Sequence, residues 1–376
     1  MTLKRLIIVW VLACPSAAWA THTEHVVLVT LDGVRWQDVF RGAAPELLAD
    51  ETYVKDASVR ARFQGDTLKQ RRVKLLPFFW HRLAKDGVVW GDRDQNSPAS
   101  VTNPYYFSYP GYNEMLTGVA DPAIDSNDNV WNPNVTVLEW LEAQDRFAGK
   151  VAAFASWEAF TYILNTRRSG LAVNAGYVPA RGSPLGASLE LLNVLQSQVP
   201  QFWEGERVDA FTHHYAMDAL RTQRPSILYI SYGDTDEFAH AGQYDAYLQA
   251  MNRCDAFLEE LWRTLQADPY YQGKTALIVT TDHGRGERPL DAWRHHASQQ
   301  VVAGQPDYLK QYPRGIVGSD QVWIAVMGPD TPARGVLANV EPVFTNQVAA
   351  SVARLLGLNF NSAYPQAGVA LPGLVE

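Results

Sequence analysis

Residues 26–33, VVLVTLDG, indicate the fold class: an unbroken apolar, mostly β-branched run ends on an acidic residue and a glycine. The same order recurs where residues 227–232 precede DTDEFAH at 234–240, and where residues 276–280 precede TDHG at 281–284. Strands that are apolar on both faces are typical of a parallel sheet covered by helices on each side. The carboxyl ends of such strands lie at one rim, so side chains distant in sequence can meet there.

The rest of the chain alternates strand and helix patterns, without a repeat or a low-complexity linker. Further short strands are predicted at 88–90, 151–154 and 322–327, and helices at 75–85, 136–143, 208–222, 244–265 and 347–356. Residues 161–207 have weak periodicity and many Gly and Pro, which predicts an insert on the substrate side. We therefore expect a doubly wound, mostly parallel α/β sheet with helices on both faces, in one domain spanning 21–376.

The first twenty residues have the pattern of an export signal. Lys4 and Arg5 precede an apolar core at 6–12, and AWA at 18–20 is a small-x-small cleavage site. The apolar core is too short to cross a bilayer as a helix, which takes about 20 residues. We expect a periplasmic or secreted protein that begins at Thr21, without a transmembrane segment.

The chain has two cysteines. Cys14 lies in a stretch that resembles a lipobox, so a lipoprotein is the alternative, although Leu12 and Pro15 fit that pattern poorly. Cleavage after Ala20 leaves only Cys254, so no intramolecular disulfide is expected and the fold must be held by its core.

The formal net charge of −8 argues against a general nucleic-acid binder, because no basic surplus exists to displace counterions from phosphates. A basic cluster between residues 60 and 74 is an exception. A charge run is usually a solvated loop, and we interpret this cluster in that way. We expect no stable nucleic-acid binding.

Metal-binding side chains follow all three main strands: Asp32, Asp236, His240, Asp282 and His283. Asp236 and His240 are four residues apart, so on a helical turn they would face the same direction. Asp282 and His283 are adjacent and need a sharp turn, which Gly284 can supply. Carboxylates and imidazoles in this mixture suit a pair of divalent cations of the zinc or manganese kind.

Asp32 taken alone fits a helix cap as well as a metal ligand. The candidate nucleophile lies in residues 107–118, FSYPGYNEMLTG. Pro110 suits the first turn of a helix, which places Ser108 just before its N-terminus, where N–H groups favour an oxyanion. A serine needs a base or a metal to act as a nucleophile. The alternative is that Ser108 only caps the helix.

Together these motifs resemble the alkaline phosphatase superfamily, and most of all its nucleotide pyrophosphatase/phosphodiesterase branch. Residues 31–36, LDGVRW, resemble the branch's Asp-Gly-x-Arg motif. SYPG at 108–111, with LTG at 116–118, resembles its Thr-Phe-Pro-Asn nucleophile motif followed by Thr-Gly. Asp236 and His240, and then DHG at 282–284, match its later ligand motifs in order. The match spans nearly the whole chain after residue 20.

The resemblance implies two metal ions, with zinc as the first choice and manganese as the alternative. It assigns one ion to Asp236, His240 and His296, with His295 as the alternative third ligand. It assigns the other ion to Asp32, Ser108, Asp282 and His283. In the implied mechanism Ser108 attacks phosphorus and water then cleaves a phosphoserine intermediate.

The chain departs from the motif at the nucleophile. Serine replaces threonine, and Gly111 replaces the asparagine that donates to a phosphate oxygen. Asn113 lies two residues on and is the candidate replacement, so we predict a catalytic role for it. The expected partner is a small phosphate ester, and the resemblance does not choose between monoester, diester and pyrophosphate.

Three rival functions stay open. A sulfatase is expected to carry Ser- or Cys-x-Pro-x-Arg, and Tyr112 stands in place of the arginine. A phosphotransferase or mutase would keep the phosphoserine, but sugar-phosphate mutases act in the cytoplasm and exported phosphoethanolamine transferases carry membrane helices. A non-catalytic metal-binding homologue should have lost ligands, whereas this chain keeps every expected ligand type.

Overall fold

The computed structural model describes residues 22–182, 184–304 and 309–375. The predicted export signal at 1–20 lies outside the described residues. Within them, no helix combines the length and the apolar character that a membrane crossing requires.

The described residues form an eight-stranded sheet in the order β10-β2-β9-β7-β1-β6-β4-β5. Its strands are β1 (His25–Leu31), β2 (Val88–Trp90), β4 (Val151–Ala155), β5 (Ala172–Ala175), β6 (Ile227–Tyr232), β7 (Thr275–Thr280), β9 (Ile324–Met327) and β10 (Gly335–Val336). β1 pairs in parallel with β6 and β7, so Val29 lies opposite Ile230 on one side and Val279 on the other. Among the described strands of this sheet, β9 alone runs antiparallel to its neighbours, β7 and β2. The mostly parallel sheet is confirmed.

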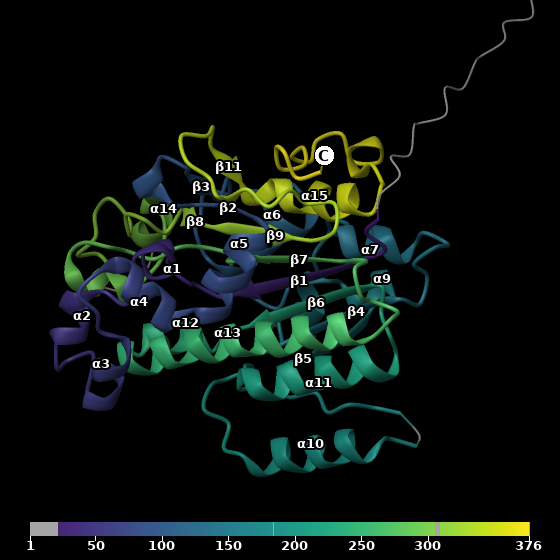
Figure 1. Ribbon diagram of the computed structural model, residues 1–376, viewed down its shortest axis with the longest axis horizontal. Helices are drawn as coiled ribbons and strands as arrows, with labels where there is room; N and C mark the ends of the chain where they lie inside the picture. The colour runs from purple at the N-terminus through teal and green to yellow at the C-terminus, as the bar shows by residue number, and fades with distance from the viewer. Residues whose placement is uncertain (1–21, 183, 305–308, 376) are drawn as a thin grey trace, which may run out of the picture.

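Helices cover both faces of the sheet (Figure 1). Val27 and Val29 of β1 pack into one core with α1 (Trp36–Arg41), α2 (Pro45–Ala49), α3 (Ala57–Phe63), α11 (Asp209–Thr222) and α13 (Tyr244–Ala267). Val26 and Leu28 face the opposite core, with α6 (Ser108–Thr117), α7 (Val137–Glu142), α8 (Phe160–Ile163) and α15 (Val348–Leu355). Because successive strand side chains point to opposite faces, one apolar run supplies both cores. The doubly wound α/β fold is confirmed.

Two predicted elements differ from the structure. The predicted helix at 75–85 is divided: α4 (Leu68–Leu75) ends where it was expected to begin, and a π-helical turn η1 (Phe79–Leu83) and α5 (Ala84–Asp86) follow. Pro77 explains the break, because it lacks an N–H and disfavours helical geometry in the residue before it. The predicted strand at 322–327 is also divided, and β8 (Gln321–Val322) joins a second sheet with β3 (Ala99–Ser100) and β11 (Val343–Phe344).

The insert at 161–207 lies only partly on the substrate side. It contains α9 (Thr166–Ser169), β5 at the sheet edge and α10 (Ala187–Gln198), which is the outermost layer beyond α11 (Figure 1). The segment after α10 returns to the carboxyl rim, where the Trp203 ring lies 5.2 Å from the Phe238 ring.

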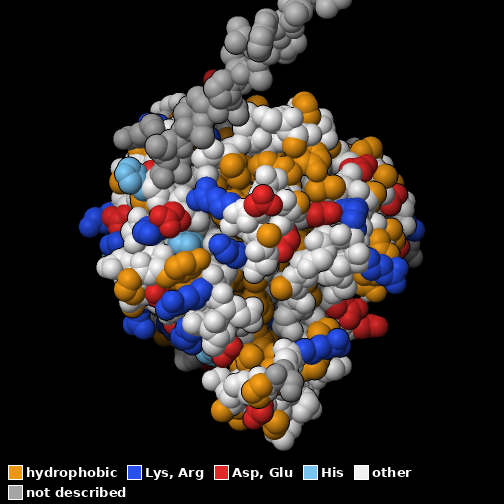
Figure 2. All heavy atoms as spheres, turned by 90° about the vertical axis from the view of Figure 1, so that its right-hand side faces the viewer, with side chains coloured by type: hydrophobic (Ala, Val, Ile, Leu, Met, Phe, Trp, Pro, Cys, Tyr) orange, Lys and Arg blue, Asp and Glu red, His pale blue; other side chains and the backbone are white. Residues whose placement is uncertain are grey.

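The basic cluster at 60–74 is helical, contrary to the expected loop. Its residues lie on α3 and α4, and several bind locally: Arg60 Nε donates to Leu48 O at 2.6 Å, and the Arg72 guanidinium lies 3.6 Å from the Trp80 ring centroid. Figure 2 shows the side of the molecule away from α3 and α4, and there basic and acidic side chains are interspersed.

Candidate metal centre

The carboxyl rim brings the predicted ligands together. Asp32 follows β1, Asp236 and His240 lie on α12 (Asp234–His240) after β6, and Asp282 and His283 follow β7. Their ligand atoms fall into two groups, each within 4.8 Å. We call Asp32, Asp282 and His283 the buried centre, and Asp236, His240 and His296 the half-exposed centre.

The buried centre contains carboxylate oxygens that lack a protein donor. Asp32 Oδ1 and Asp282 Oδ2 each lie 3.4 Å from His283 Nε2, and neither oxygen has a hydrogen-bond partner. Buried polar atoms are rarely left unpaired, so these two oxygens fit a bound cation. Asp32 is not a helix cap, because Arg35 occupies the N-cap position of α1.

The charges of the buried centre are interdependent. Burial alone would lower the pKa of His283, but Asp282 and Asp32 raise it to about 9. Burial, followed by the charge of Asp32, raises the pKa of Asp282 to about 7. His283 Nδ1–H donates to Gly284 O at 2.9 Å, which leaves Nε2 facing the carboxylates. Without a metal, the two carboxylates therefore favour the protonated form of His283.

Gly284 allows a close approach of the backbone, whereas the turn that we predicted there stays a prediction. A side chain there would overlap the carbonyl oxygens of Gln321 and Gly318. Gly111 has a similar role, because a Cβ at this position would lie 2.5 Å from Asp282 O. Helix α6 can therefore approach the loop that carries Asp282 and His283 only if residue 111 has no side chain.

Ser108 is the first residue of α6, whose N-cap is Phe107, and the Ser108 side chain makes no capping bond. Its Oγ lies 3.4 Å from His283 Nε2, beside the buried centre. One turn later on the same helix, Tyr112 OH donates to Asp32 Oδ2 at 2.8 Å. Helix α6 therefore positions both the predicted nucleophile and one predicted ligand.

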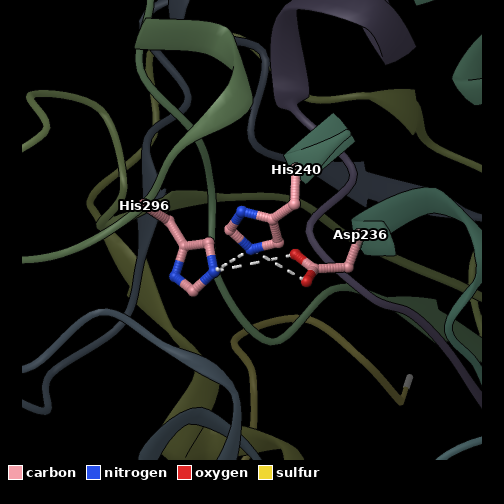
Figure 3. Close-up of side chains that lie close together, drawn as sticks. All are labelled: Asp236, His240 and His296. Carbon is pink, nitrogen blue, oxygen red and sulfur yellow. Dashed lines mark hydrogen bonds and ion pairs between the residues drawn. The ribbon is translucent and has the colours of Figure 1, made fainter. Parts of the chain in front are cut away.

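The half-exposed centre joins α12 to the loop after η3 (Leu290–Arg294) (Figure 3). His240 Nε2 lies 3.1 Å from Asp236 Oδ2 and 3.0 Å from His296 Nε2. His296 Nδ1 lies 3.1 Å from Tyr106 O, and because a carbonyl only accepts, Nδ1 carries the proton and the Nε2 lone pair faces the group. Burial, followed by nearby His283, lowers the pKa of both imidazoles. Two neutral imidazoles and a carboxylate are a suitable ligand set for zinc.

The two adjacent histidines are placed differently. His296 belongs to the half-exposed centre, whereas the ring of His295 lies 6.4 Å from that of His240 and 6.0 Å from that of Tyr312. The rings of His296 and His283 stack at 3.7 Å, so the two centres are direct neighbours. This arrangement matches the implied alignment, in which His296 is the third ligand, and its role as a ligand stays a prediction.

Asn113 is not brought to this site. It is fully buried, its Nδ2 donates to Val119 O at 3.1 Å, and its Oδ1 accepts from Asn132 at 3.1 Å and Asn134 at 3.2 Å. Five residues after Ser108, it lies on a different face of α6. The structure gives no support to its predicted catalytic role.

Asn127 contacts the residue that follows Ser108, although the sequence did not single it out. Its Oδ1 accepts from Tyr109 N–H at 2.9 Å, which places an exposed side-chain amide at the first turn of α6. Only the polar run at 125–129 marked this region in the sequence. The amide Nδ2 is a suitable donor to an oxyanion bound beside Ser108.

Arg285 is a second residue that the sequence reasoning missed, although it directly follows Gly284. It is buried and contacts Asp236 Oδ1, donates from Nε to Gly33 O at 3.0 Å, and donates from Nη1 to Arg294 O at 2.7 Å. Arg285 thus ties together three rim segments and orients Asp236. Because these protein groups use its donors, we interpret Arg285 as a positioning residue.

The chain resembles known proteins in sequence and in fold. A family model described as "Type I phosphodiesterase / nucleotide pyrophosphatase" matches residues 79–327. A probable 2,3-bisphosphoglycerate-independent phosphoglycerate mutase of Leptospira interrogans is 23% identical over 247 residues, which are 65% of this chain and 39% of that protein. The match therefore spans well under half the length of this curated relative.

Solved structures share the fold. Alkaline phosphatase PafA has a TM-score of 0.57 at 12% identity, with 96% of this chain and 100% of that chain covered. Murine ectonucleotide pyrophosphatase / phosphodiesterase 5 has a TM-score of 0.51 at 13% identity, with 94% and 97% covered. The lipoteichoic acid synthase LtaP from Listeria monocytogenes has a TM-score of 0.54 at 9% identity, with 90% and 72% covered. At these identities the likeness concerns the fold alone.

Proposed function

Because the chain belongs to the type I phosphodiesterase / nucleotide pyrophosphatase family and has an alkaline phosphatase-like fold, we propose that it hydrolyses phosphoric esters with two metal ions and Ser108. Family membership by itself indicates a phosphoester hydrolase or a related phosphoryl-transfer activity. Our proposal adds to this the identity of the nucleophile, the identity of the metal ligands and a phosphoserine intermediate.

One observation carries the proposal: Ser108 Oγ lies 3.4 Å from His283 Nε2, beside buried carboxylate oxygens that lack donors. The proposed ligands are Asp32, Ser108, Asp282 and His283 for one ion, and Asp236, His240 and His296 for the other. When bound, the ions would act as Lewis acids that activate the serine hydroxyl and stabilise the leaving oxygen. We propose zinc, with manganese as the alternative.

The proposed reaction has two displacements. Ser108 Oγ attacks phosphorus in line, a phosphorus–oxygen bond forms to serine, and the bond to the leaving alcohol breaks. Water then attacks the same phosphorus and restores the serine hydroxyl. Asn127 Nδ2 donates to a non-bridging oxygen in both steps, while Tyr112 and Arg285 hold Asp32 and Asp236 in place.

The decisive experiment is a substrate panel on the purified protein: an aryl phosphate, a bis-aryl phosphate, a nucleotide and an aryl sulfate. Each is assayed after metal removal and after zinc or manganese is restored, with Ser108→Ala as the inactive variant. Ser197→Ala is the matched control, because Ser197 is exposed on α10, away from the rim. Metal-dependent hydrolysis of a phosphate ester supports the proposal. If only the aryl sulfate is hydrolysed, the proposed function is wrong and the protein is a sulfatase.

A second candidate is transfer of the phosphoryl group to an acceptor other than water. The similarity to a protein named as a phosphoglycerate mutase favours it. Product analysis separates the two functions, because hydrolysis releases phosphate or a phosphomonoester, whereas transfer yields a new ester of an added alcohol.

We also propose that the protein is exported as a single domain, 21–376, after cleavage behind Ala20. The charged start, the short apolar core and the AWA site support this proposal. Mass spectrometry of periplasmic or secreted material should show Thr21 as the first residue, whereas a lipidated Cys14 at the N-terminus would contradict it.

A further inference from the structure

We infer that two buried aspartates, Asp209 and Asp234, form a reciprocal clasp that orients α12 so that Asp236 and His240 can bind a metal ion. The inference rests on the proposed function only in requiring that the half-exposed centre binds metal. Asp209 is fully buried and Asp234 is 1% exposed, and neither belongs to the two centres.

The clasp is built from the starts of two helices. Asp209 begins α11 and Asp234 begins α12. Asp209 Oδ1 accepts from Gly233 N–H at 2.7 Å, and its Oδ2 accepts from Asp234 N–H at 3.2 Å. In return, Asp234 Oδ1 accepts from Asp209 N–H at 2.9 Å. Each carboxylate therefore satisfies N–H groups at the start of the other helix, where negative charge is also favoured.

Two neighbouring elements fix the clasp in place. Ser156, directly after β4, donates from Oγ to Asp209 Oδ1 at 2.7 Å. Arg253 of α13 donates from Nη2 to Asp234 Oδ2 at 2.9 Å. The first turn of α12 is thus tied to a strand end and to two longer helices.

The shortness of α12 makes this clasp important for the metal. The helix has seven residues, and a helix of that length is not stable without outside contacts. Asp236 and His240 both lie on it, so a change in the direction of its first turn moves both ligands together. Metal affinity depends strongly on ligand geometry, and loss of an outer partner typically costs about 10–100-fold.

The clasp acts chiefly on the half-exposed centre. Asp32, Asp282 and His283 follow β1 and β7, and α12 contacts this group through Thr235 Oγ1, which donates to the backbone carbonyl of Asp32 at 2.6 Å and not to its carboxylate. A purely structural role would lower the stability of the fold and weaken both centres together. A positioning role weakens the half-exposed centre and leaves the buried centre unchanged.

The test is a metal titration of the metal-free protein. Binding is monitored by calorimetry and, when Co²⁺ is the titrant, by the absorption of the bound ion. Wild type should bind two ions, and His296→Ala identifies the signal of the half-exposed centre. In Asp209→Asn an amide –NH₂ replaces one of the two carboxylate oxygens. It then faces the backbone N–H of Gly233 or Asp234 and cannot accept a hydrogen bond from it. We expect this variant to bind the ion of the half-exposed centre about 10–100-fold more weakly, with the other ion unchanged.

Asp255→Asn is the matched control. Asp255 is also buried, and its carboxylate accepts from the N–H groups of Phe78 at 2.7 Å and Phe79 at 2.8 Å, at a helix that carries none of the seven proposed ligands. We expect a lower melting temperature and wild-type affinity for both ions. Ser156→Ala and Arg253→Gln should show the Asp209→Asn pattern with a smaller change, and they provide the test if Asp209→Asn does not fold.

Three results would overturn the clasp: wild-type affinities in Asp209→Asn, equal weakening of both ions, or the same selective loss in Asp255→Asn. Failure of the proposed function gives a different result in the titration of the wild-type protein. If the wild-type protein binds fewer than two ions, the two-metal site is refuted; the clasp is refuted with it only if the missing ion is the one that His296→Ala removes.

Discussion

The two candidate metal centres are neighbours, yet the protein surrounds them very differently. In the buried centre Asp282 and His283 are fully buried and Asp32 is 7% exposed. In the half-exposed centre the side chain of His240 is 40% exposed. The buried centre has two carboxylates and an imidazole with a raised pKa, while the half-exposed centre has one carboxylate and two imidazoles with lowered pKa values.

This difference indicates a division of labour. A buried pair of carboxylates needs a positive charge, because an unpaired buried charge is costly. The buried centre therefore suits an ion that stays beside Ser108 during turnover. The half-exposed centre reaches solvent through His240, while the side chains of Asp236 and His296 are 15% and 8% exposed. This placement suits an ion that meets the leaving oxygen and the incoming water.

The largest expected effect comes from the nucleophile. We expect Ser108→Ala to lower kcat at least about a thousandfold, because no other group replaces the attacking oxygen. Both ions should remain bound, since Ser108 is one ligand among several. Metal content and turnover are measured on the same preparation, with Ser197→Ala as the control. Wild-type turnover in Ser108→Ala would end the phosphoserine proposal.

The next effect separates the two adjacent histidines. We expect His296→Ala to lower activity by orders of magnitude and to release one ion, because its Nε2 faces the half-exposed centre. His295→Ala should cost no more than about 10–100-fold and keep both ions, as an outer contact would. Metal analysis of both variants decides the matter. Loss of an ion from His295→Ala would instead show that the alignment is shifted by one residue.

A smaller effect is expected at the oxyanion donor. Asn127→Ala should lower kcat about 100-fold with both ions retained, because a lost oxyanion donor typically costs 10²–10³. Asn129→Ala is the matched control, since this exposed asparagine contacts Glu158 at 3.3 Å and not α6. Equal kcat values for the two variants would remove Asn127 from the mechanism.

The smallest expected effect is a difference in pH dependence between the centres. In the metal-free protein the pKa of His283 is about 9, above its ordinary value, so the ring is protonated at pH 7–8 and a metal must displace that proton. Affinity at the buried centre should rise about tenfold per pH unit up to about pH 9 and then level off. Affinity at the half-exposed centre should change little above pH 7, because its imidazoles are already neutral. Titrations at four pH values test this, and equal slopes would contradict it.

Local patterns in the sequence predicted most of the fold. The run at 26–31 forms all but the first residue of β1 (His25–Leu31), and the residues predicted as a strand at 227–232 are those of β6. Thr136 caps α7 as predicted, with its side chain accepting from Glu139 N–H. Such features succeed because an apolar run or a cap acts over a few residues. The prediction of one helix at 75–85 was wrong, because Pro77 interrupts helical geometry although the apolar periodicity continues past it.

The sequence by itself determined the fold class, the family resemblance and the candidate ligands, because strand runs and short ligand motifs are written in neighbouring residues. Only the tertiary structure decided which side chains meet across the rim. Arg285 contacts Asp236, Asn127 binds the first turn of α6, and Asp209 clasps α12 from 25 residues before Asp234. The tertiary structure also gives no support to a catalytic role for Asn113, because its side-chain amide forms hydrogen bonds inside a buried network. The physical reason is that these contacts arise from the packing of distant loops, which no local spacing encodes.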